Sequence, residues 1–236
     1  MRKSFLTTRW SQIATAFDDS DKNQPKALNR LFEDYWYPIY AAIRRFGHPH
    51  HDAEDLCQQF FFEALKRKSF ANADRSRGKF RTFVLACLKN FLHNSHRSDN
   101  AEKRGGHISF THDFKEAENT YSDESRTNLS PEALFERLLA LRLIDLARAE
   151  LTAENIADGK ASLYSALESK IFDSEADETY ETLSTKLDRP VGTLKSEVRE
   201  FRNRLREILR DHVAETLCDP RDVDQEIQYL QAALQS

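Results

Sequence analysis

Residues 179–210 constrain the fold most strongly, because their apolar residues recur at spacings of three and four. Such spacings place side chains on one face of an α-helix. The apolar face comprises Val191, Leu194, Val198, Phe201, Leu205 and Ile208. A basic stripe at the same spacing, displaced by one residue, comprises Lys195, Arg199, Arg202 and Arg206. The sequence therefore predicts a long amphipathic helix with one basic side.

A second, shorter helix is predicted directly before the long one. Tyr180, Leu183 and Leu187 share a helical face, and residues 188–190 (Asp-Arg-Pro) supply a compact turn. Proline is favoured in the first turn of a helix, where its missing N–H costs nothing. A short helix, a tight turn and a long basic helix are typical of DNA-binding helix-turn-helix motifs. Glu197 and Glu200 leave open the alternative of an ordinary solvated helix.

The first half of the chain predicts three further helices, over residues 27–46, 52–67 and 80–97. Each carries apolar residues at helical spacing. Pro38 is expected to kink the first of them or to remove one of its hydrogen bonds. Gly47 is placed as its C-terminal cap, and Asp52 as the N-terminal cap of the next helix. We therefore expect an all-α protein.

Charge is distributed unevenly along the 236 residues and suggests two modules. Residues 24–98 contain 13 Lys and Arg against 7 Asp and Glu, whereas residues 105–179 contain 7 against 16. An acidic segment between two more basic ones would be repelled by nucleic acid. We expect two helical modules joined by an acidic flexible linker, with five segments: an N-terminal extension (1–23), a first module (24–98), the linker (99–129), a helix-turn-helix module (130–212) and a C-terminal amphipathic helix (213–236).

Several other classes of protein are disfavoured by the sequence. The N-terminus has no apolar run of signal-peptide length, and no later segment is expected to span a bilayer, so a cytoplasmic location is expected. Cys57, Cys87 and Cys218 are odd in number and widely spaced, which favours reduced thiols. The histidines near residues 48–51 and 93–96 lack partners at a zinc-ligand spacing. We expect no metal, no cofactor and no catalytic residue.

Two surfaces of the first module nevertheless have the composition of binding sites. Phe62 shares a helix side with Asp55 and Gln58, opposite the apolar stripe, which suits a protein-binding surface. Packing of Phe62 on the first helix is an equal alternative. The loop 71–79 is basic, and the free face of helix 80–97 is rich in amides and cations. A basic loop beside a polar helix is typical of proteins that hold nucleic-acid strands through phosphates and exposed bases.

Three segments together resemble bacterial sigma factors of the extracytoplasmic-function type. They are DAEDLCQQFFFEALKR (52–67), GKFRTFVLACLKNFLHNSHR (78–97) and GTLKSEVREFRNRLREIL (192–209). TRWSQI (8–13), KRGGH (103–107), SPEALFERLLAL (130–141) and DPRDVDQEIQYLQAAL (219–234) are similar to a subgroup common in planctomycetes. The resemblance implies a transcription initiation factor, not an enzyme, with a region 2-like bundle and a region 4-like helix-turn-helix. Its implied partners are core RNA polymerase, through the clamp coiled coil of the largest subunit and the flap of the second-largest, and promoter DNA; an anti-sigma factor is a further candidate partner.

The resemblance also assigns roles to particular residues. The polymerase-binding set is Asp52, Glu54, Asp55, Gln58, Gln59 and Phe62. The set implied to bind and melt the minus-10 element is Arg75, Arg77, Lys79, Arg81, Lys89, Asn90, His93 and Arg97. The set implied to bind the minus-35 duplex is Gly192, Thr193, Lys195, Ser196, Arg199, Arg202 and Arg206. The family pattern differs at Gln59, Asp188, Pro190, Glu197 and Glu200.

Alternatives to this interpretation remain open at the level of sequence. A dimeric helix-turn-helix regulator would explain residues 179–210 but gives no role to residues 52–97. A helical hydrolase built on the acids and histidines of residues 48–63 has no partner acids elsewhere. The C-terminal helix, with Val223, Ile227, Leu230 and Leu234 on one face, is expected either to complete the second module or to lay its acids against the basic stripe of residues 195–206.

Overall fold

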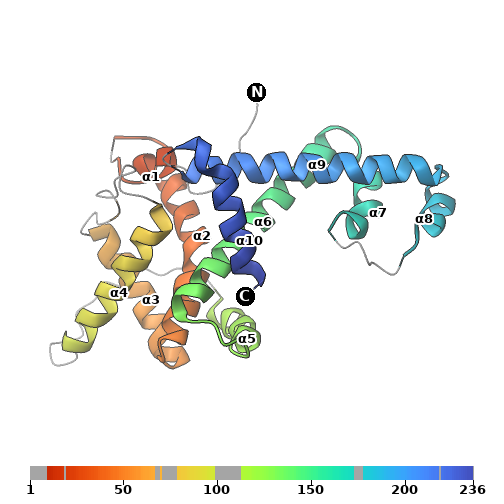
Figure 1. Ribbon diagram of the computed structural model, residues 1–236. Helices are drawn as coiled ribbons and strands as arrows, with labels where there is room; N and C mark the ends of the chain where they lie inside the picture. Colours follow the sequence, from red (N-terminus) through yellow and green to blue (C-terminus); the bar gives the residue numbers. More distant parts are fainter. Residues whose placement is uncertain are drawn as a thin grey trace. The chain divides into compact units, whose positions relative to one another are not determined.

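The computed structural model describes residues 10–18, 20–66, 70, 79–98, 113–172, 178–217 and 219–235. Every regular element in these ranges is helical, which confirms the all-α prediction (Figure 1). The elements are α1 (Trp10–Ala16), α2 (Gln24–Arg45), α3 (His50–Lys66), α4 (Phe80–Ser98), α5 (Phe114–Glu124), α6 (Pro131–Ala157), α7 (Ala161–Phe172), α8 (Tyr180–Leu187), α9 (Val191–Thr216), the 3-10 turn η3 (Pro220–Asp222) and α10 (Val223–Gln235). No helix in these ranges has the length and apolar character needed to span a membrane.

Backbone contacts divide the chain into two compact units, with both boundaries inside helices. Of the described residues, the first unit comprises those within 10–142 and 213–235, and the second comprises those within 143–212. The start of α6 was expected to belong with the helix-turn-helix module, yet its first three turns lie in the first unit. The reason is burial, because Leu134, Phe135, Leu138 and Leu139 all join the first hydrophobic core.

The core of the first unit is rich in aromatic side chains. Tyr40, Phe61, Phe70 and Phe135 are all fully buried. Many of the rings meet edge to face, as at Phe32 and Phe61, whose centroids are 4.8 Å apart. Such pairs add about 0.5–1.5 kcal/mol to the burial of the rings themselves. This packing holds α2, α3 and α4 together and so fixes the outward faces of α3 and α4.

The central helix α2 continues through Pro38 and ends at a glycine, as predicted for its C-terminus. Pro38 is buried inside the continuous helix, so the proline does not end it. Gly47 has φ +102° and donates its N–H to the carbonyl of Arg44 at 3.0 Å, while His48 N–H reaches Ile43 O at 3.4 Å. This pair of bonds is a Schellman motif, which needs a residue with positive φ. The next helix, α3, begins at His50, which places Asp52 inside its first turn.

The expected flexible linker contains a helix, α5, which is a correction to the prediction. The side chain of Asp113 caps α5 by accepting from the N–H groups of Lys115 and Glu116. Phe114 and Tyr121 are buried, and the Phe114 ring meets both Trp36 and Tyr40 on α2 at 5.6 Å. These aromatic contacts order residues 113–128, whose composition is otherwise polar. Residues 99–112 of the expected linker lie outside the described residues.

The second unit contains the predicted helix-turn-helix. Its core includes Leu183 from α8 and Leu194, Val198 and Phe201 from α9. The turn depends on Asp188, which has φ 49° and ψ 48° and donates its N–H to Ser184 O. Asp tolerates this left-handed backbone better than most residues. The apolar stripe predicted from the sequence is therefore the buried face of α9.

The C-terminal helix α10 belongs to the first unit, which differs from both expectations for it. Val223 and Leu230 are buried, and Glu226 is only 2% exposed. Glu226 is paired with Lys79 and Arg81 at the beginning of α4. The hypothesis that this acid lies against the basic stripe of α9 is therefore wrong, because its carboxylate is already held by two cations of the first unit.

Candidate nucleic-acid and polymerase interfaces

The outer side of α3 carries the predicted polymerase-binding residues. Asp52, Asp55 and Gln59 are exposed, whereas Glu54, Gln58 and Phe62 are half-buried. Phe62 is not among the described side chains that form or pack against the first core. Lys66 lies one turn further on, with its Nζ 5.8 Å from the centroid of the Phe62 ring. Phe62 thus belongs to the outer side of α3, together with the carboxylates and amides.

The predicted minus-10 residues divide between two sides of α4. On one side, Lys79 and Arg81 are paired with Glu226, Arg81 also contacts Glu136 at 2.7 Å, and Lys89 is paired with Glu132. Burial alone would lower the pKa of Arg81, but the carboxylates of Glu136 and Glu226 outweigh it and raise that pKa. Arg81 is 9% exposed. These cations are thus neutralised by acids from α6 and α10, a pairing that the sequence did not reveal.

The other side of α4 forms a pocket with α3. Its volume is about 570 Å³, and its lining residues are Gln59, Phe60, Glu63, Ala64, Phe70, Cys87, Asn90, Phe91, Asn94 and Ser95. Aromatic rings offer surfaces on which a nucleobase can stack. Side-chain amides both donate and accept hydrogen bonds, as a base edge requires. Phe60 and Phe70 are buried, so the ring that a base could reach is the half-buried Phe91, beside the exposed amide of Asn90.

Sequence reasoning identified only part of this pocket. Asn90 was predicted to contact the minus-10 strand, and it is exposed at the pocket. Gln59 was assigned to polymerase binding instead, although it lines the same pocket. Gln59 and Glu63 are one helical turn apart, and this spacing was the signal that could have placed both of them opposite Asn90.

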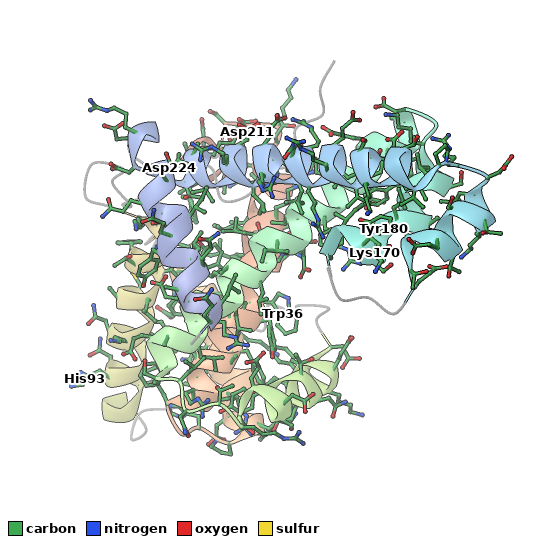
Figure 2. The ribbon with its side chains drawn as sticks, turned by 45° about the vertical axis from the view of Figure 1, so that its right-hand side comes forward. Trp36, His93, Lys170, Tyr180, Asp211 and Asp224 are labelled. Atoms are coloured by element: carbon green, nitrogen blue, oxygen red, sulfur yellow. The ribbon has the colours of Figure 1, made fainter. Side chains whose placement is uncertain are left out.

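The remaining minus-10 residues are less fully described. His93 is exposed and points away from α4 (Figure 2). Arg75 and Arg77 lie outside the described residues. Arg97 lies within α4, but its side chain is also outside the described part.

The exposed side of α9 carries most of the predicted minus-35 residues. Gly192, Thr193, Lys195, Ser196, Arg199 and Arg206 are all exposed. The Lys195 ammonium nitrogen lies 5.5 Å from the centroid of the Tyr180 ring. The Lys170 ammonium nitrogen lies 5.7 Å from the same centroid (Figure 2). Arg206 donates to the Asn203 side chain at 2.7 Å. The exposed residues therefore form one polar, basic strip along the first four turns of α9.

Arg202 has a different environment from the other members of the basic stripe. It donates from Nε to Ile171 O at 3.1 Å and from Nη2 to Lys170 O at 2.7 Å. The last carbonyls of a helix have no partner within the helix, and basic side chains often satisfy them. In this structure Arg202 joins α9 to the end of α7. The resemblance to sigma factors and the helical spacing assigned it to DNA, but neither shows which groups a long side chain contacts.

Cys57 and Cys87, the two described cysteines near these surfaces, are not activated as nucleophiles. Burial raises the pKa of the Cys57 thiol, and the charge of Glu54 raises it further; burial also raises the pKa of Cys87. Thiols with raised pKa values are poor nucleophiles at neutral pH. Both are free thiols. Among the described residues, no group of three His, Cys, Asp or Glu side chains is placed to hold a metal ion.

Comparison with known proteins identifies one domain family. Residues 31–102 match the family described as Sigma-70 region 2. This range contains α3, α4 and the pocket between them. No curated protein and no solved structure matches the chain significantly. The match shows that residues 31–102 resemble region 2 of sigma factors, which are DNA-binding proteins that confer promoter-specific transcription initiation on RNA polymerase.

Proposed function

We propose that this chain is a sigma factor of the extracytoplasmic-function type, similar to the planctomycete subgroup. It binds core RNA polymerase, recognises the minus-35 duplex through α9 and opens the minus-10 element at α4. The observation that carries the proposal is the Sigma-70 region 2 match over α3, α4 and their pocket, in a chain that also contains a helix-turn-helix. Such a factor acts in the cytoplasm, where polymerase and chromosome are found.

The division of work between the two DNA surfaces follows from their chemistry. Lys195 and Arg199 are exposed cations on a helix that begins directly after the turn, which suits the major groove and the phosphates beside it. Asn90 lies at a pocket walled by aromatic rings, which suits an unstacked base. The first surface therefore binds duplex DNA, and the second holds a base of the opened strand.

The docking of polymerase is assigned to the outer side of α3. Interfaces between proteins often combine an aromatic anchor with a rim of polar groups. Phe62 is the half-buried aromatic residue of this side, and Asp52, Asp55 and Gln58 precede it on the same helix within three turns. Gln59 extends from the same helix to the pocket, so it links the polymerase surface to the DNA surface.

The proposal is tested by transcription of genomic DNA fragments with purified bacterial core polymerase, with and without the chain. Sequencing of the RNA 5′ ends should reveal start sites that appear only when the chain is present and that share two upstream elements. The Lys195→Ala/Arg199→Ala variant should lose these start sites, whereas Asn90→Ala should retain duplex binding but lose strand opening by permanganate footprinting. Identical start sites with and without the chain would overturn the proposal.

The competing candidate is a dimeric helix-turn-helix regulator that does not bind core polymerase. It accounts for the exposed cations of α9 but not for the Sigma-70 region 2 match. It predicts binding to a palindromic duplex site as a dimer. Sedimentation of the chain with core polymerase separates the two functions, because only the sigma factor should co-sediment.

A further inference from the structure

The beginning of α4 is occupied by an acid from the opposite end of the sequence. Glu226 of α10 is paired with Lys79 and with Arg81, and its side chain is only 1% exposed. The Lys79 side chain remains 37% exposed. Lys79 is the last residue before α4, directly after the loop 71–78 that contains Arg75 and Arg77. The carboxylate therefore lies at the point where the basic loop meets the helix.

A tyrosine one turn along α10 reinforces this contact. The Lys79 ammonium nitrogen lies 5.1 Å from the centroid of the Tyr229 ring. The central carbon of the Arg81 guanidinium lies 5.3 Å from the same centroid. Burial raises the pKa of the Tyr229 hydroxyl, and the nearby carboxylate of Glu136 on α6 raises it further, so α10 lies beside both α4 and α6. Lys79 and Arg81 thus both contact two side chains of α10, Glu226 and Tyr229, which are one helical turn apart.

The hydrophobic core of the first unit does not depend on this helix. The described members of that core come from residues 13–139, and none of them belongs to α10. The contact of α10 with Lys79 and Arg81 is made by a carboxylate and the face of an aromatic ring. Contacts of this kind resemble those that phosphates and bases make with cationic proteins. Exchange of α10 for nucleic acid would therefore leave that core in place and would expose Val223 and Leu230, which are buried in the attached helix.

We propose that α10 is an intramolecular competitor of promoter DNA, with the Glu226 carboxylate in the place of a minus-10 strand phosphate between Lys79 and Arg81. The inference rests on the proposed function, because it concerns the regulation of the same DNA-binding surface. While α10 is attached, Glu226 neutralises the positive charge of Lys79 and Arg81, so the beginning of α4 binds single-stranded DNA weakly. Release of α10 leaves Lys79 without its acid and free to bind the strand, while Arg81 keeps its pair with Glu136 of α6.

The size of the effect depends on how often α10 is attached. The apparent dissociation constant of a masked site exceeds its intrinsic value by the reciprocal of the unmasked fraction. A helix attached for about 90% of the time therefore weakens strand binding about tenfold. A carboxylate buried with two cations should be attached at least that often, because releasing it must compete with both ion pairs.

The test measures binding of a fluorescein-labelled pool of randomised 20-nucleotide single-stranded DNA to the full-length protein by anisotropy. Glu226→Gln keeps the shape of the side chain and removes its charge, and a variant ending at residue 218 removes α10 completely. Asp222→Asn is the matched control, because it removes one negative charge from an exposed position in the same tail. Glu226→Gln/Lys79→Gln tests whether the released cation binds the strand. Circular dichroism establishes that each variant is folded.

The competitor inference predicts that Glu226→Gln and the truncated protein bind the pool about tenfold more tightly than the parent, while Asp222→Asn changes binding less than twofold. It also predicts that adding Lys79→Gln reverses most of the gain. If the parent and Glu226→Gln bind the pool equally and Glu226→Gln/Lys79→Gln binds it more weakly, α10 does not compete with DNA. Lys79 would still be part of the DNA-binding surface. If no variant binds DNA and core polymerase gains no start sites, the proposed function fails and the inference fails with it.

Discussion

Arg44 and Glu118 form a two-pronged ion pair between helices that are 74 residues apart in sequence. Arg44 donates from Nε to Glu118 Oε2 at 2.9 Å and from Nη2 to Oε1 at 2.7 Å. The Tyr40 hydroxyl donates to the same carboxylate at 2.6 Å, and the Arg44 guanidinium lies over the Tyr121 ring. These contacts attach α5 to α2, in a segment whose composition predicted a flexible linker.

The first prediction is that this pair adds to the aromatic contacts that hold α5 on α2. Arg44→Lys keeps the charge but cannot make two parallel hydrogen bonds. The loss should lower the free energy of local opening of α5 by about 1–3 kcal/mol. Hydrogen exchange of residues 114–124 should accelerate accordingly. Arg126→Lys, at an exposed position just after α5, is the control and should leave the exchange unchanged.

The second prediction concerns the pH dependence of stability. Burial raises the pKa of Asp34 from 3.8 to about 6, although Arg142, 3.0 Å away, opposes the shift. The folded state therefore binds more protons than the unfolded state between these values, so this contribution to the free energy of unfolding is present at low pH and is lost as the pH rises from about 4 to about 6. Its size is up to about 3 kcal/mol.

Denaturant unfolding measured at several pH values tests this component. Asp34→Asn should remove the decline in stability between pH 4 and pH 6, because asparagine does not titrate. Glu33→Gln, at the exposed neighbouring position, is the matched control and should keep most of the decline. Identical pH dependence of unfolding in the parent and in Asp34→Asn would contradict the assignment.

The third prediction separates two arginines of the α9 stripe. Arg202→Ala leaves the carbonyls of Lys170 and Ile171 without their partner, which should cost about 1–3 kcal/mol of stability. Arg199→Ala should leave the melting temperature unchanged and weaken binding to minus-35 duplex, with a smaller dependence on salt. Thermal unfolding and duplex binding of both variants test this division. If Arg202 were the DNA-binding residue, Arg202→Ala would weaken duplex binding and leave the melting temperature unchanged.

The fourth prediction uses Cys87 as a probe of the pocket. A maleimide attached to Cys87 should fill part of the space beside Asn90 and weaken single-strand binding at least tenfold. Because burial raises the pKa of this thiol, labelling should be slow at neutral pH and faster at higher pH. Cys218→Ser confines labelling to Cys87, since Cys57 is buried. Unchanged strand binding after complete labelling would show that the pocket holds no base.

The sequence predicted the parts of the fold that depend on regular repeats. The apolar stripe of α9, the glycine cap at Gly47 and the compact turn at residues 188–190 follow from local spacing and residue type, and the structure confirms each of them. Helix α5 escaped prediction because Phe114 and Tyr121 become ordered only by contact with distant residues of α2. The composition of residues 113–128 alone does not predict a contact with residues so far away in the sequence.

At the candidate site, too, features set by local spacing could be predicted, whereas contacts between residues distant in sequence could not. The polar side of α3 and the amide-bearing side of α4 could be read from helical periodicity. The pairing of Lys79 and Arg81 with Glu226 could not, because it joins positions about 145 residues apart through side chains of opposite sign. Charges of this kind have many candidate partners in a sequence with 35 basic and 39 acidic residues.

The affinity of the chain for purified core polymerase tests the central claim most directly. The variant Asp55→Ala/Gln58→Ala/Phe62→Ser changes the outer side of α3, and Lys115→Ala/Asn119→Ala changes exposed residues of α5 as a control. Truncating the centre of an interface commonly costs 2 kcal/mol or more, which is about a thirtyfold loss of affinity. We predict tight binding by the parent and the control, and at least a thirtyfold weaker binding by the α3 variant with unchanged helicity. Equal affinity of all three proteins for core polymerase, or no binding by any of them, would contradict the account.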